Sequence, residues 1–164
     1  DHKKLLSINS YYLNTESDSA IIELISLSKG VEIPIVNQEK IKLILEHVKT
    51  KSKTLNELIE LIEYLLMVRP PIIDSVMMEL LNSEKIKLLD FFYRDLSSIK
   101  DWSIQEITYL FEKFTNDQNI KLIDIAKPLR IVLTGRIVPT GIYELIYALG
   151  KEDTLTRISQ HLYK

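Results

Sequence analysis

The chain has 164 residues, of which 46% are hydrophobic and 27% are charged, a composition typical of globular proteins rather than disordered or fibrous ones. Cysteine is absent, which excludes a disulfide framework, a thiolate nucleophile and a Cys-ligated zinc site. The formal net charge is −2, so binding to a nucleic acid or an anionic membrane would require a local basic patch.

The longest stretch without a charged residue, residues 5–15, lies near the start of the sequence. It is too short and too polar to span a bilayer or to serve as a signal peptide. We therefore expect a cytoplasmic protein with no membrane partner.

Apolar residues recur at helical spacing along nearly the whole chain. Asn37 is the expected N-cap of one early helix, and Thr54 with Glu57 has the spacing of a capping box at the start of another. Pro70 and Pro71 are expected to break the chain. In this first part the pattern predicts helices over residues 21–25, 41–48 and 55–66.

The second part of the chain has the same periodicity. Ser103 with Glu106 repeats the capping box, and Gly135 and Gly150 follow apolar stripes where a left-handed residue ends a helix. The aromatic run Phe91, Phe92 and Tyr93 is expected to fill the core. Helices are predicted over residues 104–114, 122–133, 142–149 and 155–162.

The number and spacing of these segments predict the fold class. We count roughly eight to ten short helices and no convincing strand. Short connections favour antiparallel packing, hence an all-α protein in the form of a compact cage. An internal boundary is expected near residues 98–102, which divides the cage into two helical sub-bundles, 1–101 and 102–164.

The residues that usually carry catalysis are poorly placed. No glycine-rich phosphate loop occurs, and His2, His47 and His161 lie too far apart in sequence to suggest a zinc site. The acidic residues of the middle region are expected on solvated helix faces. The chain therefore does not have the pattern of a catalyst or a metal protein.

Two local basic clusters remain. Lys49, Lys51 and Lys53 alternate in what is expected to be a loop, so that the three ammonium groups would share one face. Lys127, Arg130 and Arg136 lie in a stretch where no acid occurs from residue 125 through residue 143. Such patches fit a phosphate backbone, and they equally fit an ordinary solvated surface.

The segment Lys127–Ile158 closely resembles the C-terminal segment of bacterial-type glutamyl-tRNA synthetases. Four blocks occur in the family's order, and together they are highly specific. These blocks are Pro128-Leu129-Arg130, Leu133-Thr134-Gly135, Gly141-Ile142-Tyr143-Glu144 and Leu149-Gly150-Lys151-Glu152.

The resemblance extends over the whole chain. Asn9 and Tyr12 match an element at its start, although Ser7 stands where Trp is usual, and Lys53-Thr54-Leu55 is similar to a loop-to-helix element of the family. Trp102 with Ser103 matches the opening of a later helix. The resemblance implies an isolated anticodon-binding region without its own cofactor. The catalytic part, with ATP and Mg²⁺, would lie upstream of Asp1.

The resemblance also implies which residues contact the anticodon. Arg130 has a planar fork that could address a base edge or stack on a base. The loop after Gly135 would approach the first anticodon base, with Gly141 allowing close approach and free N–H groups of the next helix addressing base oxygens. Capping of that helix by the Thr140 hydroxyl is the structural alternative. The loop residues concerned are Pro139, Thr140, Gly141 and Ile142.

Lys51 falls where the family carries an Arg that reads the third anticodon base. A lysine is a point donor and cannot reproduce a bidentate fork. Weaker discrimination at that base would let the enzyme charge tRNA(Gln) as well as tRNA(Glu). Weaker contacts with the RNA backbone are expected from Lys49, Lys53, Lys127 and Arg136.

The resemblance therefore implies the tRNA anticodon-binding module of a monomeric glutamate–tRNA ligase, attached to the catalytic domain of the same chain. One alternative is the same module in a non-discriminating enzyme. A second, from a different class, is a helical protein-interaction module that binds no RNA.

Overall fold

The computed structural model describes residues 2–67 and 69–162, apart from the side chains of residues 6 and 8. These residues form ten α-helices and one short 3-10 helix, with no strand among them, which confirms the predicted all-α fold. They divide into two compact units, Asp1–Leu66 and Met67–Lys164.

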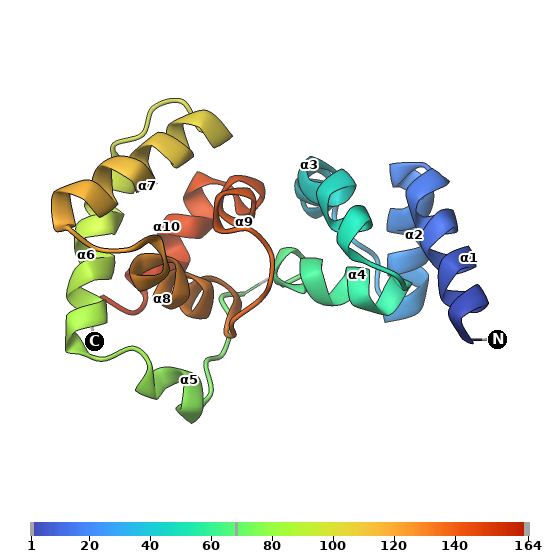
Figure 1. Ribbon diagram of the computed structural model, residues 1–164, viewed down its shortest axis with the longest axis horizontal. Coiled ribbons are helices and arrows are strands. Elements are labelled where there is room, and N and C mark those ends of the chain that lie inside the picture. The colour runs from blue at the N-terminus through green and yellow to red at the C-terminus, as the bar shows by residue number, and fades with distance from the viewer. Residues whose placement is uncertain (1, 68, 163–164) are drawn as a thin grey trace. The chain divides into compact units, whose positions relative to one another are not determined.

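The first unit consists of α1 (His2–Thr15), α2 (Asp18–Lys29), α3 (Ile35–Lys51), α4 (Leu55–Ile62) and the 3-10 helix η1 (Glu63–Leu65) (Figure 1). The central element is α3, which packs against α1, α2, α4 and η1. The apolar faces of α2, α3 and α4 are buried together. The fully buried side chains at this centre include Ile21, Ile25, Ile41, Ile44, Leu45, Leu58, Ile62 and Leu65.

Two boundaries in the first unit differ from the predicted ones. The helix α3 begins two residues before Asn37, so Asn37 is not an N-cap; its side-chain amide instead donates to the carbonyl of Leu65 at 2.6 Å. The same helix runs on through Lys51, which was expected in a loop. The Thr54 cap of α4 is confirmed, since Thr54 Oγ1 accepts from the N–H of Glu57 at 3.2 Å, while the Glu57 carboxylate accepts from the N–H of Lys53 at 2.7 Å and not from that of Thr54 as a capping box requires.

The second unit consists of α5 (Ser75–Glu79), α6 (Ser83–Ser97), α7 (Ile104–Gln118), α8 (Leu122–Thr134), α9 (Ile142–Leu149) and α10 (Lys151–Ser159). Here α6 packs against α7, α8 and α10, while α7 packs against α9. The predicted cap of α7 is present, since Ser103 Oγ accepts from the N–H of Glu106 at 3.3 Å. Gly135 and Gly150 both have positive φ, at 81° and 88°.

The chain divides at residues 66 and 67, not at the boundary predicted near residues 98–102. Aromatic packing explains the difference, because Phe92 on α6 lies 4.6 Å from Phe111 and 5.1 Å from Phe114 on α7, between ring centroids. The indole of Trp102 donates to the carbonyl of Tyr147 at 3.3 Å, which ties the segment before α7 to α9. Residues on both sides of the predicted boundary therefore share one core.

The aromatic run on α6 is only partly internal. Phe92 is fully buried, whereas Phe91 is 47% exposed and Tyr93 is half-buried. Consecutive helical residues point about 100° apart, so three adjacent aromatic residues cannot all face one core.

Candidate nucleic-acid interface

The end of α8 is fixed by Thr134 and Gly135. The hydroxyl of Thr134 lies 2.8 Å from the carbonyl oxygen of Arg130 and 2.7 Å from that of Arg136, and it is 3.3 Å from the N–H of Arg136. Gly135 adopts the left-handed conformation and donates its N–H to the carbonyl of Ile131 at 2.7 Å. The helix therefore ends in a closed turn, and the chain leaves it in a defined direction.

Gly135 also lies against the start of the second unit. A Cβ at this position would meet the Cβ of Pro71 at 3.1 Å and the carbonyl oxygen of Ile72 at 3.2 Å. Any side chain would be strained by the positive φ and crowded by backbone atoms. The glycine of the Leu133-Thr134-Gly135 block is thus required by the packing of this unit.

Arg157 on α10 is a second anchor of the same turn. It is only 4% exposed, and its Nη1 donates to the carbonyl of Leu133 at 2.6 Å. A cation at the C-terminal end of a helix is favoured by the partial negative charge of the unpaired carbonyls. This contact joins α10 to the end of α8, immediately before the candidate loop.

Arg130 holds the other end of the loop. Its Nε and Nη2 both donate to the carbonyl oxygen of Thr140, at 3.4 and 3.2 Å. The guanidinium is half-buried, and desolvation lowers the pKa of Arg130 from its usual value. Since an arginine pKa lies far above neutrality, the group stays charged and provides charge-assisted hydrogen bonds.

The predicted loop residues differ in exposure. Thr140 is 1% exposed and Ile142 is 3% exposed as whole residues, so both are buried, backbone included. Pro139 is exposed, as are Arg136 and Ile137 next to it. The surface that the loop offers to a ligand is therefore one cation beside two apolar side chains.

The start of α9 is built around Gly141, which is the N-cap residue, so the alternative of Thr140 as N-cap is wrong. A Cβ on Gly141 would collide with the carboxylate of Glu144, which folds back over the first turn. The space that was expected to admit a base is thus taken by a side chain of the same helix. Burial, followed by the charges of Glu112 and Glu144, raises the pKa of the neighbouring Tyr143.

Lys127, on α8 one turn before Arg130, is exposed. It lines a groove with residues of α5, α6 and the preceding loop, where Glu79 and Asp124 supply negative charge. Across this groove Lys85 lies 4.0 Å from Asp124. Residues 125–143 contain no acidic residue, but in the folded chain acidic side chains from other segments lie close to Lys127.

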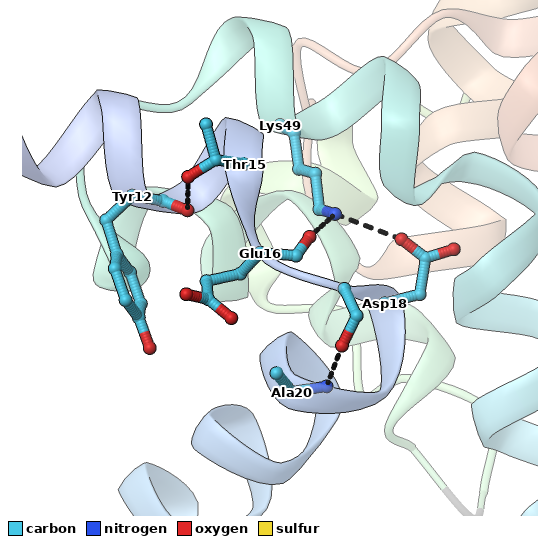
Figure 2. A network of polar contacts seen from close by, with 7 residues as sticks. Tyr12, Thr15, Glu16, Asp18, Ala20 and Lys49 are labelled. Atoms are coloured by element: carbon cyan, nitrogen blue, oxygen red, sulfur yellow. Dashed lines mark hydrogen bonds and ion pairs between the residues drawn. The ribbon is translucent and has the colours of Figure 1, made fainter.

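The first basic cluster does not share one face. Because α3 extends through Lys51, Lys49 and Lys51 project about 200° apart. Lys49 is 7% exposed, and its Nζ lies 2.9 Å from the carbonyl oxygen of Glu16 and 3.0 Å from Oδ1 of Asp18 (Figure 2). Lys51 and Lys53 are exposed. Lys49 thus connects α3 to the junction of α1 and α2.

Sequence reasoning missed Arg157 and Glu144 as parts of this site. Glu144 stands three residues after Gly141, which is the spacing of a capping pair, so a local signal existed. Arg157 has no local signal, since it acts on a carbonyl 24 positions earlier. Only the packing of α10 against α8 brings the two together.

Neither a metal centre nor a membrane span is found among the described residues. No group of three or more His, Asp or Glu residues there could hold a metal ion. None of the described helices is long and apolar enough to cross a bilayer.

Comparison with known proteins identifies relatives of the whole chain. It is 28% identical to glutamate–tRNA ligase 2 of Bartonella quintana, over 99% of this chain and 36% of the relative. It is 30% identical to the glutamate–tRNA ligase of Nitrobacter hamburgensis, over 96% of this chain and 35% of the relative. The chain thus spans about a third of the length of these relatives.

Solved structures show the same fold. A glutamate tRNA ligase from Elizabethkingia meningosepticum, in complex with its amino acid, superposes with a TM-score of 0.74 at 19% identity, over 96% of this chain and 31% of that one. The glutamate-tRNA synthetase of Elizabethkingia anophelis gives 0.74 at 18% identity, over 100% of this chain and 32% of that one. These findings confirm the resemblance to the anticodon-binding region of glutamyl-tRNA synthetases. The family described as anticodon binding domain matches residues 19–162, and the chain belongs to that family.

Proposed function

We propose that this chain binds the anticodon loop of tRNA(Glu), as the recognition part of a glutamate–tRNA ligase. The observation that supports this best is the loop of residues 136–141. Its backbone is held by Thr134 and Arg130, while its exposed surface combines the cation Arg136 with Ile137 and Pro139. Such a surface suits an unstacked base and the phosphate beside it.

Each residue of the proposed interface has a role that fits its exposure. Pro139 and Ile137 form an apolar ledge for a base, and the half-buried Gly141 can offer a backbone group. Thr140 and Ile142 are buried and support the loop from within. Arg136 and Lys127 in the second unit, and Lys51 and Lys53 in the first, are exposed cations that can neutralise phosphates. Lys49 is left out of the proposal, because its ammonium is committed to Glu16 and Asp18.

The rest of the reaction belongs to the part of the relatives that this chain does not span. There we propose that ATP and Mg²⁺ activate glutamate for transfer to the tRNA. Among the described residues no ligand set for a metal ion is found. The contribution of this chain is affinity, orientation and choice of the anticodon.

The test is a titration of the chain with a tRNA(Glu) anticodon stem-loop at several salt concentrations. A few single-strand phosphate contacts predict a slope of roughly −2 to −4 for log K against log salt. A stem-loop with a permuted anticodon is the matched control and should bind less tightly. No binding at low salt would favour a helical protein-interaction module instead.

A second proposal concerns tRNA(Gln). Lys51 ends α3 and is exposed, so it can give a base one charge-assisted contact where an arginine would give two. Lys51→Arg should therefore sharpen the preference for cytosine over guanine at the third anticodon base by about 1 kcal/mol. Competition titrations with Glu-type and Gln-type stem-loops, at one salt concentration, measure this ratio. An unchanged ratio would place Lys51 against the RNA backbone or solvent.

A further inference from the structure

The first unit contains an open cleft of about 350 Å³ beside α1. The described residues that line it are two lysines and two serines, namely Lys3, Ser7, Ser10 and Lys53. All four belong to the unit Asp1–Leu66. The cleft therefore forms within one compact part of the chain.

Helix geometry explains why these side chains meet. Lys3, Ser7 and Ser10 are spaced i, i+4 and i+7, so they lie along one face of α1. Lys53 lies in the turn between α3 and α4. The packing of α1 against α3 brings this turn to the same cleft.

The charge of this cleft differs from that of two other grooves on the molecule. Its charged lining residues, among those described, are both cations. The groove beside α5 and the one beside α2 each include two carboxylates, which would repel an anion. These carboxylates belong to Glu79 and Asp124 in the first groove, and to Glu23 and Glu32 in the second.

The polar groups of the cleft are accessible to a ligand. Lys3, Ser7 and Lys53 are exposed, and Ser10 is half-buried. The carboxylate of Glu57 accepts from the backbone N–H of Lys53 at 2.7 Å, but it does not line the cleft. Because an ammonium carries three donors and a serine hydroxyl carries one, the cleft combines two positive charges with several hydrogen-bond donors.

We propose that this cleft binds a phosphate group. Lysine binds phosphate as a point charge, and the serine hydroxyls can donate to the phosphate oxygens. A volume of about 350 Å³ lies at the lower end of the range for ligand sites, which is roughly 300–1,000 Å³. The cleft therefore has room for a phosphate and the sugar attached to it.

This inference goes beyond the proposed function, because it assigns a site on α1, outside the loop of residues 136–141. The same chemistry suits the phosphomonoester of a small molecule and the phosphodiester of an RNA. Inorganic phosphate is sufficient to test the site itself, and two further titrations distinguish the sources.

The experiment is a titration of the chain with inorganic phosphate at constant ionic strength, followed by the amide shifts in nuclear magnetic resonance spectra. Lys53→Gln removes one cation, whereas Ser7→Trp keeps both charges and takes up space in the cleft. Lys4→Gln is the matched control. It removes an exposed cation from the next position of α1, which projects about 100° away from Lys3 and does not line the cleft. Circular dichroism establishes that each variant retains its helices.

We expect saturable shifts at the amides of residues 7, 10 and 53. Lys53→Gln should weaken phosphate binding roughly tenfold, because one charge-assisted contact is lost. Ser7→Trp should weaken it by a similar factor. Lys4→Gln should change it by less than about twofold, since salt screens a charge outside the cleft. Absence of saturable shifts in the unaltered chain would overturn the inference, and so would equal losses in Lys53→Gln and Lys4→Gln.

The source of the phosphate is distinguished with adenosine monophosphate, with adenosine as its control, and with tRNA(Glu). A small-molecule site predicts that the nucleotide binds more tightly than inorganic phosphate, and that Lys3→Gln leaves the affinity for tRNA(Glu) unchanged. An RNA site predicts that Lys3→Gln weakens tRNA(Glu) binding and lowers its salt slope by about 0.7–0.9. Failure of the unaltered chain to bind tRNA(Glu), with the phosphate shifts retained, would overturn the proposed function and leave the phosphate site intact.

Discussion

At the scale of single residues, Lys49 contributes to the stability of the first unit through contacts that the neighbouring lysines do not make. Its ammonium is 3.0 Å from Asp18 and 2.9 Å from the Glu16 carbonyl, and it is nearly buried. Lys49→Met should lower the free energy of unfolding by about 1–2 kcal/mol, because Asp18 is half exposed and regains water while the Glu16 carbonyl loses a charged donor.

Urea unfolding followed by circular dichroism measures this change. Lys51→Met, two positions away and exposed, is the matched control and should change stability by less than about 0.5 kcal/mol. Equal effects of the two substitutions would contradict the structural role of Lys49.

Two glycines with similar backbone angles give a paired test of packing. Gly30 and Gly135 have φ of 64° and 81°, but a Cβ on Gly30 would meet nothing within 4 Å, whereas one on Gly135 would crowd Pro71 and Ile72. Gly30→Ala should therefore cost about 1 kcal/mol of strain alone, and Gly135→Ala about 2–3 kcal/mol. Thermal unfolding of both variants gives the comparison. A larger cost at Gly30 would show that the contact with Ile72 is unimportant.

Single-residue predictions succeed where the deciding contact is local. Thr54 with Glu57 was correctly identified as a cap, because donor and acceptor lie three residues apart. Lys49 was assigned to an RNA-facing loop, since the length of α3 depends on packing against four other elements. Asn37 was wrongly named a cap because its acceptor, Leu65, lies 28 residues away.

At the scale of elements, α8 and α10 are joined by one buried arginine. Arg157→Met keeps much of the apolar stem but removes the donor to the Leu133 carbonyl at the end of α8. We expect a loss of about 1–3 kcal/mol in stability, since a buried carbonyl is left without this bond. We also expect faster amide exchange at residues 133–136.

Denaturant unfolding and hydrogen exchange measure the two effects. The variant Arg157→Lys distinguishes the contribution of the positive charge from that of the guanidinium geometry. A lysine keeps the cation and is expected to restore stability only in part, because it lacks the fixed guanidinium geometry. Full stability in Arg157→Met would mean that the cation contributes no net energy at this site.

Most helices were predictable because apolar periodicity is a property of each segment. The stripes at residues 104–114, 122–133 and 142–149 lie within α7, α8 and α9. The short helix α5 was not foreseen, and none of its residues is buried, so no apolar stripe could indicate it. The residues of the loop at 136–141 were identified through the family resemblance, but their orientation depends on Arg130 and Thr134.

At the scale of the whole molecule, the division at residues 66 and 67 predicts where a protease cuts first. Residues 70–74 have no regular structure, and Ile72 is 96% exposed. Brief treatment with thermolysin should cleave within residues 70–80 before any other segment, because exposed irregular backbone is cut first.

Mass spectrometry locates the cut, and circular dichroism of the products tests whether both units stay helical. The segment at residues 98–103 is the internal control. It should resist, since Trp102 donates to the carbonyl of Tyr147 and Lys151 donates to that of Ile99. Early cleavage there would instead support the boundary that the sequence predicted near residues 98–102.

The pairing of α6 with α10 has a consequence for the order in which the chain folds during its synthesis. The ribosome releases α1–α4 and η1 before the second unit, and these elements include the four against which α3 packs. In the second unit, α6 packs against α7 and α8 as well as α10, so its apolar face is fully covered only when α10, more than fifty residues later, has emerged. We therefore expect the first unit to fold on the translating ribosome, while part of α6 stays exposed to chaperones until α10 emerges.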